Sequence, residues 1–157
     1  MGYESTLYNL VLLLHILAAI VGFGGIALNS IYLARARALP GQQGHAVLEA
    51  NSFVTSKVSE MAIYATFLFG IVLIIVSDGA IEFSEGWISA AFAVMIIMVG
   101  VIHGMIRPAT RQLIELSGSG SGTGEAGGLE RRVTIGTAVL NVLLVIALAL
   151  MIWQPGA

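Results

Sequence analysis

The stretch LYNLVLLLHILAAIVGFGGIALNSIYL, residues 7–33, decides the fold class, because it contains no Asp, Glu, Lys or Arg. A helix of about 20 apolar residues is long enough to cross the ~30 Å hydrocarbon layer of a membrane. The run is too long for the core of a signal peptide, and no basic residue precedes it. We therefore predict that residues 7–33 form a retained membrane span.

Three similar runs follow, and we predict further spans at about 58–77, 86–106 and 133–153. Of the 157 residues, 57% are hydrophobic and 10% are charged, whereas about 25% of a soluble domain is charged. The four runs account for most of the chain, so residues 1–157 form a single membrane domain. The predicted fold class is all-α, an integral membrane four-helix bundle.

The connections between the spans carry their own predictions. Arg107-Pro108 is expected to end the third span, because proline removes a helical hydrogen bond. Residues 47–59 mix small, polar and apolar side chains, and we expect them to extend the second helix beyond the membrane. Residues 117–128 are rich in glycine and serine, which predicts a flexible linker on the cytoplasmic side.

The distribution of charge predicts the orientation of the chain. All seven basic residues lie in the connections after the first and third spans, 34–58 and 107–132. The remaining connection, 78–86, carries only acidic charges, and neither terminus has a basic residue. Cytoplasmic loops collect Lys and Arg. We therefore predict a multi-pass protein in a lipid bilayer, with both termini outside the cytosol.

Several kinds of chemistry are excluded by composition. The chain has no cysteine, which removes disulfides, thiolate metal sites, iron–sulfur ligation and cysteine nucleophiles. It has no Gly-rich phosphate loop and no HExxH motif. The basic loops are too short to read a nucleic acid, so we expect no nucleic-acid partner. No catalytic residue is identified by these patterns, and an enzymatic activity stays open.

Small and polar residues recur at alternating three- and four-residue spacing in every span. In membranes such residues face neighbouring helices, and this spacing is the seam of a left-handed bundle. We predict that the bundle interior is lined by His15, Ala18, Gly22, Gly25, Asn29 and Tyr32 of span one, by Glu60, Ile63, Phe67, Gly70, Ile74 and Ser77 of span two, by Gly86, Ser89, Ala93, Ile96, Gly100, His103 and Arg107 of span three, and by Thr134, Thr137, Asn141, Leu144, Leu148 and Met151 of span four.

His15 and His103 are candidate functional residues, because burying an ionisable group in a membrane is costly. Neutral imidazole is also a common haem and metal ligand. The alternative is that each histidine only forms hydrogen bonds between helices. At 1.5 Å per residue the two side chains are separated by roughly 15–20 Å along the membrane normal. They are therefore not expected to ligate the same metal or haem.

Glu60, His103 and Arg107 form a second candidate site, at the cytoplasmic edge of spans two and three. Such a group can bind an acidic function such as a propionate, or it can relay a proton. The alternative is a boundary ion pair that extends to water. His45 lies in a connection, where we expect it to be solvated.

Two short segments resemble a known group of proteins. Leu14-His15-Ile16, with Gly24-Gly25 and the basic end at Arg35, resembles the first helix of the HemJ-type and CopD-like small membrane proteins. The segment from Glu60 to Tyr64 is similar to their Glu-x-x-x-Tyr start of span two. HemJ-type proteins are four-helix bundles associated with haem synthesis, and CopD-like proteins are linked to copper handling. The resemblance implies a bacterial inner-membrane protein that binds haem b or a porphyrin, with His15 on the iron.

The leading hypothesis is thus a haem- or porphyrin-binding membrane protein with a redox role or a role in haem biosynthesis. Its site residues are His15, as the metal ligand, and Glu60, His103 and Arg107, for a propionate or a proton. The alternatives are a non-catalytic accessory or structural subunit and a small oligomeric transporter. In each case we expect a homo-oligomer or a subunit of a larger membrane complex.

Overall fold

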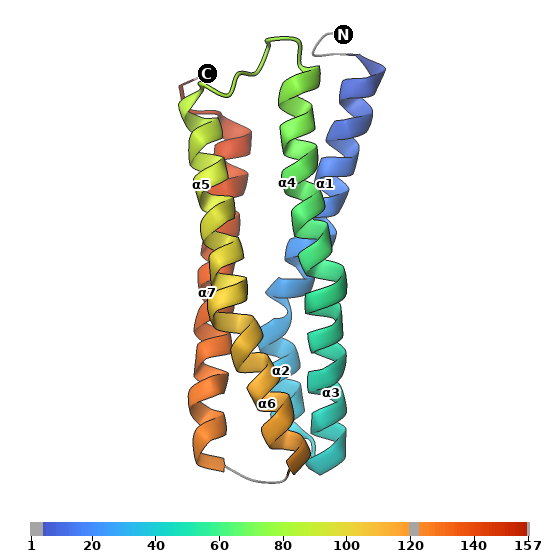
Figure 1. Cartoon of the computed structure of the whole chain (residues 1–157), viewed down its shortest axis with the longest axis vertical. Helices are drawn as coiled ribbons and strands as arrows, with labels where there is room; N and C mark the ends of the chain where they lie inside the picture. Colours follow the sequence, from blue (N-terminus) through green and yellow to red (C-terminus); the bar gives the residue numbers. More distant parts are fainter. Residues whose placement is uncertain (1–4, 120–122, 157) are drawn as a thin grey trace.

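The structure is a computed structural model that describes residues 5–119 and 123–156, and it forms four long helical rods (Figure 1). The predicted all-α four-helix bundle is confirmed. The rods consist of α1 (Thr6–Ala27) and α2 (Asn29–Ala38); α3 (Gly41–Phe53), the π-helical segment η1 (Val54–Ser59) and α4 (Glu60–Val76); α5 (Gly86–Val101), the π-helical segment η2 (Ile102–Ile106) and α6 (Arg107–Ser119); and α7 (Thr123–Trp153).

Within the described residues, four helices are long and apolar enough to cross a membrane. The outer surface of the bundle is covered by large apolar side chains, and Ile75, Ile96 and Ile152 are each about two-thirds exposed or more. Such a surface is solvated by lipid tails and not by water. The chain is therefore a multi-pass membrane protein in contact with lipid, as predicted.

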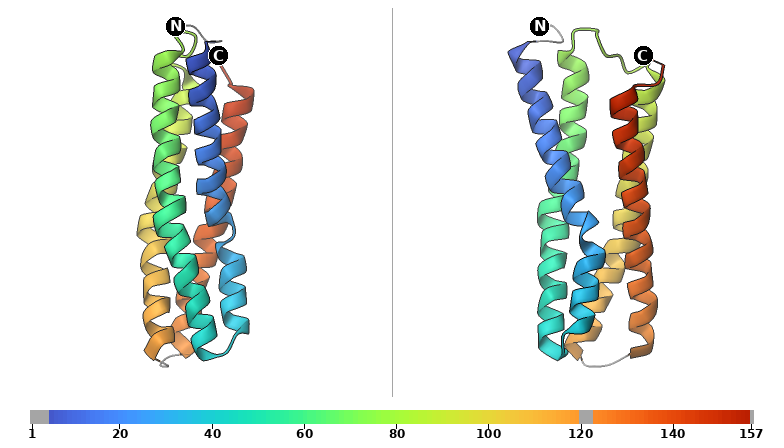
Figure 2. Two further views of the ribbon diagram at one scale, coloured as in Figure 1. Left: turned by 90° about the vertical axis from the view of Figure 1, so that its right-hand side faces the viewer. Right: turned by 180° about the vertical axis from the view of Figure 1, so that it is seen from behind.

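The two ends of the bundle differ in how tightly the rods pack. We call the end with the α4–α5 connection and both ends of the described chain the terminal end, and the opposite end the basic end (Figures 1 and 2). At the terminal end α1 packs on α4 and α5 packs on α7, and these two pairs diverge. At the basic end α2, α3, α6 and α7 converge around an apolar cluster that includes Leu33, Leu48, Leu113 and Val133.

Two glycines allow the first two rods to approach each other closely. A Cβ atom at Gly22 would lie 2.9 Å from the backbone nitrogen of Ile63, and one at Gly25 would lie 2.0 Å from Ser59 Oγ. A larger residue at position 22 would collide with the backbone of α4, and one at position 25 would displace the Ser59 hydroxyl. The predicted interior stripes of spans one and two are confirmed in this region, where Gly22, Asn29 and Ile63 are buried.

The expected end of the third span at Pro108 is wrong, because the helix continues as α6 to Ser119. The π-helical segment η2 precedes the proline, and the Arg107 backbone N–H bonds to the Ile102 carbonyl, five residues earlier. In an ordinary α-helix the proline ring would clash with the carbonyl of Gly104, four residues back. The wider π turn relieves this clash, and α6 bends away toward α3 (Figure 1).

The first rod also departs from the prediction, because α1 ends at Ala27 and α2 begins at Asn29. No proline causes this break. Asn29 is almost fully buried, and its Oδ1 accepts a hydrogen bond of 2.9 Å from Thr55 Oγ1. Asparagine side chains compete with regular helical hydrogen bonding. Beyond the break, Tyr32 of the predicted interior stripe is exposed.

The predicted interior face of span three is wrong. Gly86, Ser89, Ala93, Ile96 and Gly100 all face outward. The residues of the third rod that are buried instead are mostly bulky: Trp87, Ile88, Ala91, Met98, Ile102 and Ile106. This rod packs through large apolar side chains against α7, so the rule that small residues face neighbouring helices fails here. In span four Thr137 is buried, whereas Thr134 and Leu148 are exposed.

The connections are more helical than the sequence indicates. Residues 47–59 continue the second helix, as predicted. Of the predicted linker 117–128, residues 117–119 belong to α6 and residues 123–128 belong to α7, while 120–122 lie outside the described residues. Ala126 and Leu129 pack against the apolar cluster of the basic end, which accounts for the longer α7.

Candidate functional site

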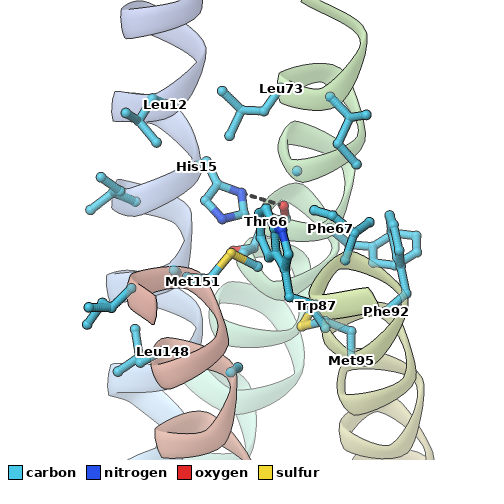
Figure 3. Close-up of a pocket in the computed structure, with 18 of the residues that line it drawn as sticks. Leu12, His15, Thr66, Phe67, Leu73, Trp87, Phe92, Met95, Leu148 and Met151 are labelled. Carbon is cyan, nitrogen blue, oxygen red and sulfur yellow. Dashed lines mark hydrogen bonds between the residues drawn. The ribbon is translucent and has the colours of Figure 1, made fainter. Parts of the chain in front are cut away.

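A cavity of about 680 Å³ lies in the terminal half, between the α1–α4 pair and the α5–α7 pair (Figure 3). Its volume is within the range of roughly 300–1,000 Å³ that is typical of small-molecule sites. The wall is almost entirely apolar and includes Phe23, Ile74, Trp87 and Met95. The splayed terminal half therefore contains room for a sizeable apolar ligand.

The cavity is closed on one side and borders lipid on another. Between α4 and α5, Phe67 meets Phe92 edge to face, with ring centroids 5.2 Å apart, and Phe83 stacks on Phe92. Between α1 and α7, the lining residues Ile20, Leu148 and Ile152 are half to three-quarters exposed. A ligand dissolved in the membrane would thus enter between α1 and α7.

His15 contributes an imidazole ring to the wall of this cavity. Its Nδ1 lies 2.8 Å from the backbone carbonyl oxygen of Thr66 on α4 (Figure 3). A carbonyl oxygen only accepts, so Nδ1 carries the proton and donates it, and Nε2 of the neutral ring keeps its lone pair. Metal-binding histidines are commonly oriented by a hydrogen bond of this kind from the nitrogen that does not bind the metal, because it sets both the tautomer and the ring direction.

Gly70 makes the contact between His15 and α4 possible. A Cβ atom at Gly70 would lie 3.3 Å from Cε1 of the imidazole ring. The glycine stands one turn after Thr66, so it leaves the Thr66 carbonyl accessible to a side chain from another helix. The sequence places Gly70 in the interior stripe but offers no signal that a backbone carbonyl would be the partner of His15.

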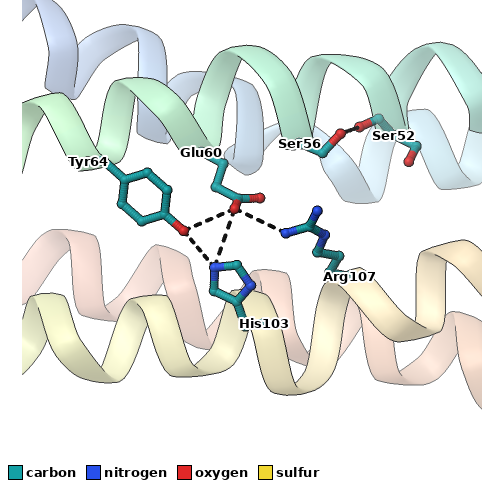
Figure 4. Close-up of polar contacts among 6 residues, drawn as sticks. All are labelled: Ser52, Ser56, Glu60, Tyr64, His103 and Arg107. Carbon is teal, nitrogen blue, oxygen red and sulfur yellow. Dashed lines mark hydrogen bonds and ion pairs between the residues drawn. The ribbon is translucent and has the colours of Figure 1, made fainter.

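A second group of polar side chains lies nearer the basic end, between the second and third rods (Figure 4). Glu60 Oε1 accepts hydrogen bonds from Tyr64 Oη at 3.0 Å and from Arg107 Nη1 at 3.2 Å. His103 Nε2 lies 3.3 Å from the same carboxylate oxygen and 2.6 Å from Tyr64 Oη. The Glu60 side chain is only 9% exposed, whereas those of His103 and Arg107 are 40% and 36% exposed.

Both π-helical segments position this Glu60 cluster, which comprises Glu60, Tyr64, His103 and Arg107. The segment η1 ends at Ser59, directly before Glu60, and η2 contains His103 and ends directly before Arg107. A π turn takes in an extra residue and so rotates the side chains that follow it. Single π turns are frequent at functional sites. Two of them flanking one cluster indicate that its geometry is specified by the fold.

The structure thus brings together three of the four predicted site residues and leaves the fourth apart. Glu60, His103 and Arg107 are in contact, as the sequence indicates, but none of them lines the cavity of His15. Tyr64 is a further member of the site that the sequence analysis does not include, although its position four residues after Glu60 places both on one helix face. His45 is half-buried at the basic end, where Nδ1 lies 2.7 Å from Ser117 Oγ.

Comparison with protein-family models, with curated proteins and with solved structures gives no match for this chain. The resemblance to HemJ-type and CopD-like proteins therefore stays a prediction. In the described part of the chain no three His, Asp or Glu side chains are grouped so that they could hold a metal ion. The candidate functional sites of the chain are the cavity with His15 and the Glu60 cluster.

Proposed function

We propose that the chain binds a haem or a porphyrin in the terminal cavity, with His15 Nε2 on the metal. The observation that carries this proposal is the hydrogen bond from His15 Nδ1 to the Thr66 carbonyl, which leaves Nε2 as a lone-pair donor beside an apolar cavity. Neutral imidazole with its second nitrogen bonded to a carbonyl is a favourable ligand for haem iron.

The residues of the cavity fit a tetrapyrrole in two respects. A single histidine suits a metal that is already held by a macrocycle, and apolar walls suit the faces of the ring. A bound haem would supply redox chemistry, whereas a bound porphyrin would itself be the substrate. The chain contributes orientation through His15 and Thr66, and exclusion of water through Phe67 and Phe92.

The Glu60 cluster serves in this proposal as a separate proton-exchanging site. A propionate contact there was expected from the sequence, but the wall of the cavity does not include Glu60, His103 or Arg107. A carboxylate, a phenol and an imidazole within hydrogen-bond distance of one another can pass a proton along the cluster.

Location and assembly complete the proposal. The chain lies in a bacterial inner membrane with its basic end in the cytosol, since all Lys and Arg residues belong to the two connections that the sequence places there. It works as a homo-oligomer or as a subunit of a larger membrane complex.

Visible absorption spectroscopy tests the ligand role of His15. We expect the detergent-purified protein, as isolated or after incubation with haem, to show a Soret peak and an α band after reduction with dithionite. His15→Ala should weaken haem binding about 10-fold or more, in line with the 10–100-fold losses that even outer-shell changes cause at metal sites.

The matched control is His45→Ala, which removes a histidine at the basic end and should leave the spectrum unchanged. An unchanged spectrum in His15→Ala would remove the ligand role. A featureless wild-type spectrum after incubation with both haem and protoporphyrin would remove the proposal and favour a structural subunit, and flux in proteoliposomes would then test the transporter alternative.

A further inference from the structure

Three of the four rods leave α-helical geometry at the same depth in the bundle. The first rod breaks at Leu28, between α1 and α2 (Figure 1). The second rod contains η1 and the third contains η2. At 1.5 Å per residue, all three irregularities lie roughly 15–25 Å from the basic end. Irregular helices inside a membrane are tolerated where other groups or water satisfy the freed backbone atoms.

Buried polar atoms without a hydrogen-bond partner gather at this depth. Within the described part of the chain they are Asn29 Nδ2, Asn51 Oδ1, Ser59 Oγ, Arg107 Nε and Thr137 Oγ1. Asn29, Ser59 and Thr137 are at most 1% exposed. Native proteins pair almost all buried polar groups with protein or with ordered water. We call these five residues, together with Thr55, the polar layer.

The polar layer is contiguous along the second rod. Asn51, Thr55 and Ser59 recur at every fourth residue and so share a face of this rod. Thr55 is bonded to Asn29 of the first rod, and Ser59 lies against Gly25, one turn before Asn29. Arg107 connects the layer to the Glu60 cluster, because Nη1 of its guanidinium donates to Glu60 while Nε has no partner.

Apolar side chains enclose the layer on both sides. Ile63 and Leu140 lie one turn from Ser59 and Thr137 toward the terminal end, and both are almost fully buried. Leu48 and Val133 lie one turn from Asn51 and Thr137 toward the basic end, in the apolar cluster there. A ligand of the layer would therefore be held in the interior and separated from bulk solvent.

The chemistry of the unpartnered atoms selects the ligand. Asn29 Nδ2 and Arg107 Nε only donate, Asn51 Oδ1 only accepts, and the two hydroxyls do either. A metal cation would need acceptors on every side, and an anion would need donors. Water both donates and accepts, and buried waters typically make about three hydrogen bonds. We propose that the polar layer binds internal water molecules, which complete the hydrogen bonding of Asn29, Asn51, Ser59, Arg107 and Thr137.

These waters hydrate the level at which the bundle changes from converging to diverging rods. They bond to side chains on all four rods, at the depth of the break in the first rod and of the two π turns. They also place a proton-exchanging neighbour beside Arg107 and hence beside the Glu60 carboxylate.

The proposal is tested on the full chain in lipid nanodiscs, by determining the structure at a resolution that shows ordered water. We expect water molecules within hydrogen-bond distance of at least three of the five unpartnered atoms. A well-resolved layer without ordered water would overturn the proposal.

Apolar isosteres give a second test by thermal unfolding, followed through the fluorescence of Trp87 and Trp153. If Thr137 Oγ1 binds water, Thr137→Val should lower the unfolding midpoint by about 2–5 °C. A hydroxyl in a dry layer has no partner to lose, so an unchanged or raised midpoint in Thr137→Val would refute the proposal. Thr134→Val, one turn away on the exposed face of α7, is the control and should leave the midpoint unchanged.

Discussion

One carboxylate oxygen organises the polar chemistry about halfway along the bundle. Glu60 Oε1 accepts hydrogen bonds from Tyr64 and Arg107 and lies beside His103, and it is buried while His103 and Arg107 are partly exposed. A buried carboxylate without partners would be costly in a membrane, and here the donors around Glu60 satisfy its hydrogen bonding. Arg107 Nε already has no hydrogen-bond partner. Removal of Glu60 would also take away the counter-charge of Arg107.

A double-mutant cycle measures this pairing. For Glu60→Ala and Arg107→Ala we expect a coupling free energy of about 1–2 kcal/mol in detergent unfolding experiments, near the upper end of values for hydrogen bonds inside membrane proteins. The control cycle uses Arg37 and Glu130, an ion pair at the basic end in which Arg37 is half exposed. It should give less than about 0.5 kcal/mol. Equal coupling free energies in the two cycles would mean that burial of Glu60 does not strengthen its interaction with Arg107.

His15 can be recognised from the sequence alone, but its hydrogen-bond partner cannot. An ionisable side chain in an apolar run stands out in any membrane sequence, and for that reason His15 was singled out from sequence alone. Its hydrogen bond goes to a backbone carbonyl on another helix, a group that every residue possesses. The choice of Thr66 as partner depends on the packing of α1 against α4 and on the missing side chain of Gly70.

At the scale of helices, glycines divide into those required by packing and those that are not. A Cβ atom at Gly22 would overlap the backbone of Ile63, whereas at Gly24 it would meet nothing within 4 Å. The two residues lie on the same helix, two positions apart, and only Gly22 faces α4. They therefore form a matched pair for testing the α1–α4 contact.

We expect Gly22→Ala to destabilise the protein by roughly 1–3 kcal/mol, because the backbone of α4 must move to accommodate the methyl group. Gly24→Ala should be neutral or stabilising by up to about 1 kcal/mol, since alanine favours helix. Thermal unfolding of both variants in the same detergent decides the comparison. A loss of stability in Gly24→Ala as large as that in Gly22→Ala would contradict the α1–α4 packing described above.

At the scale of the whole molecule, the arrangement of the rods separates two environments. The basic half is closed around apolar residues such as Leu33 and Leu113, and the terminal half opens between the helix pairs into the cavity of His15. After four passes the described chain finishes at the terminal end, where α1 also begins (Figure 1). Orientation in the membrane then decides whether His15 lies nearer the cytosolic or the external face.

Reporter fusions measure this orientation. Alkaline phosphatase fused after the C-terminus should be active, because this enzyme folds only outside the cytosol, and the same fusion after Gln42 should be inactive. Green fluorescent protein at the two positions should give the reverse result. The charge distribution predicts this pattern, since every Lys and Arg belongs to the 34–58 or 107–132 connection. Alkaline phosphatase activity only in the fusion after Gln42 would show that the chain has the opposite topology.

The number of spans and the all-α class were determined by the sequence alone, because they depend on hydropathy along the chain, a local property. The contact of Glu60 with Arg107 was also predictable, since both stand at the same edge of their spans. The face that span three presents to its neighbours was decided only by the tertiary structure. A helix in lipid is apolar on every side, so Met98 and Ile96 look equivalent in the sequence, yet Met98 is fully buried and Ile96 is exposed. The rotation of that helix, the π turns and the cavity depend on contacts between distant residues, which a single sequence does not specify.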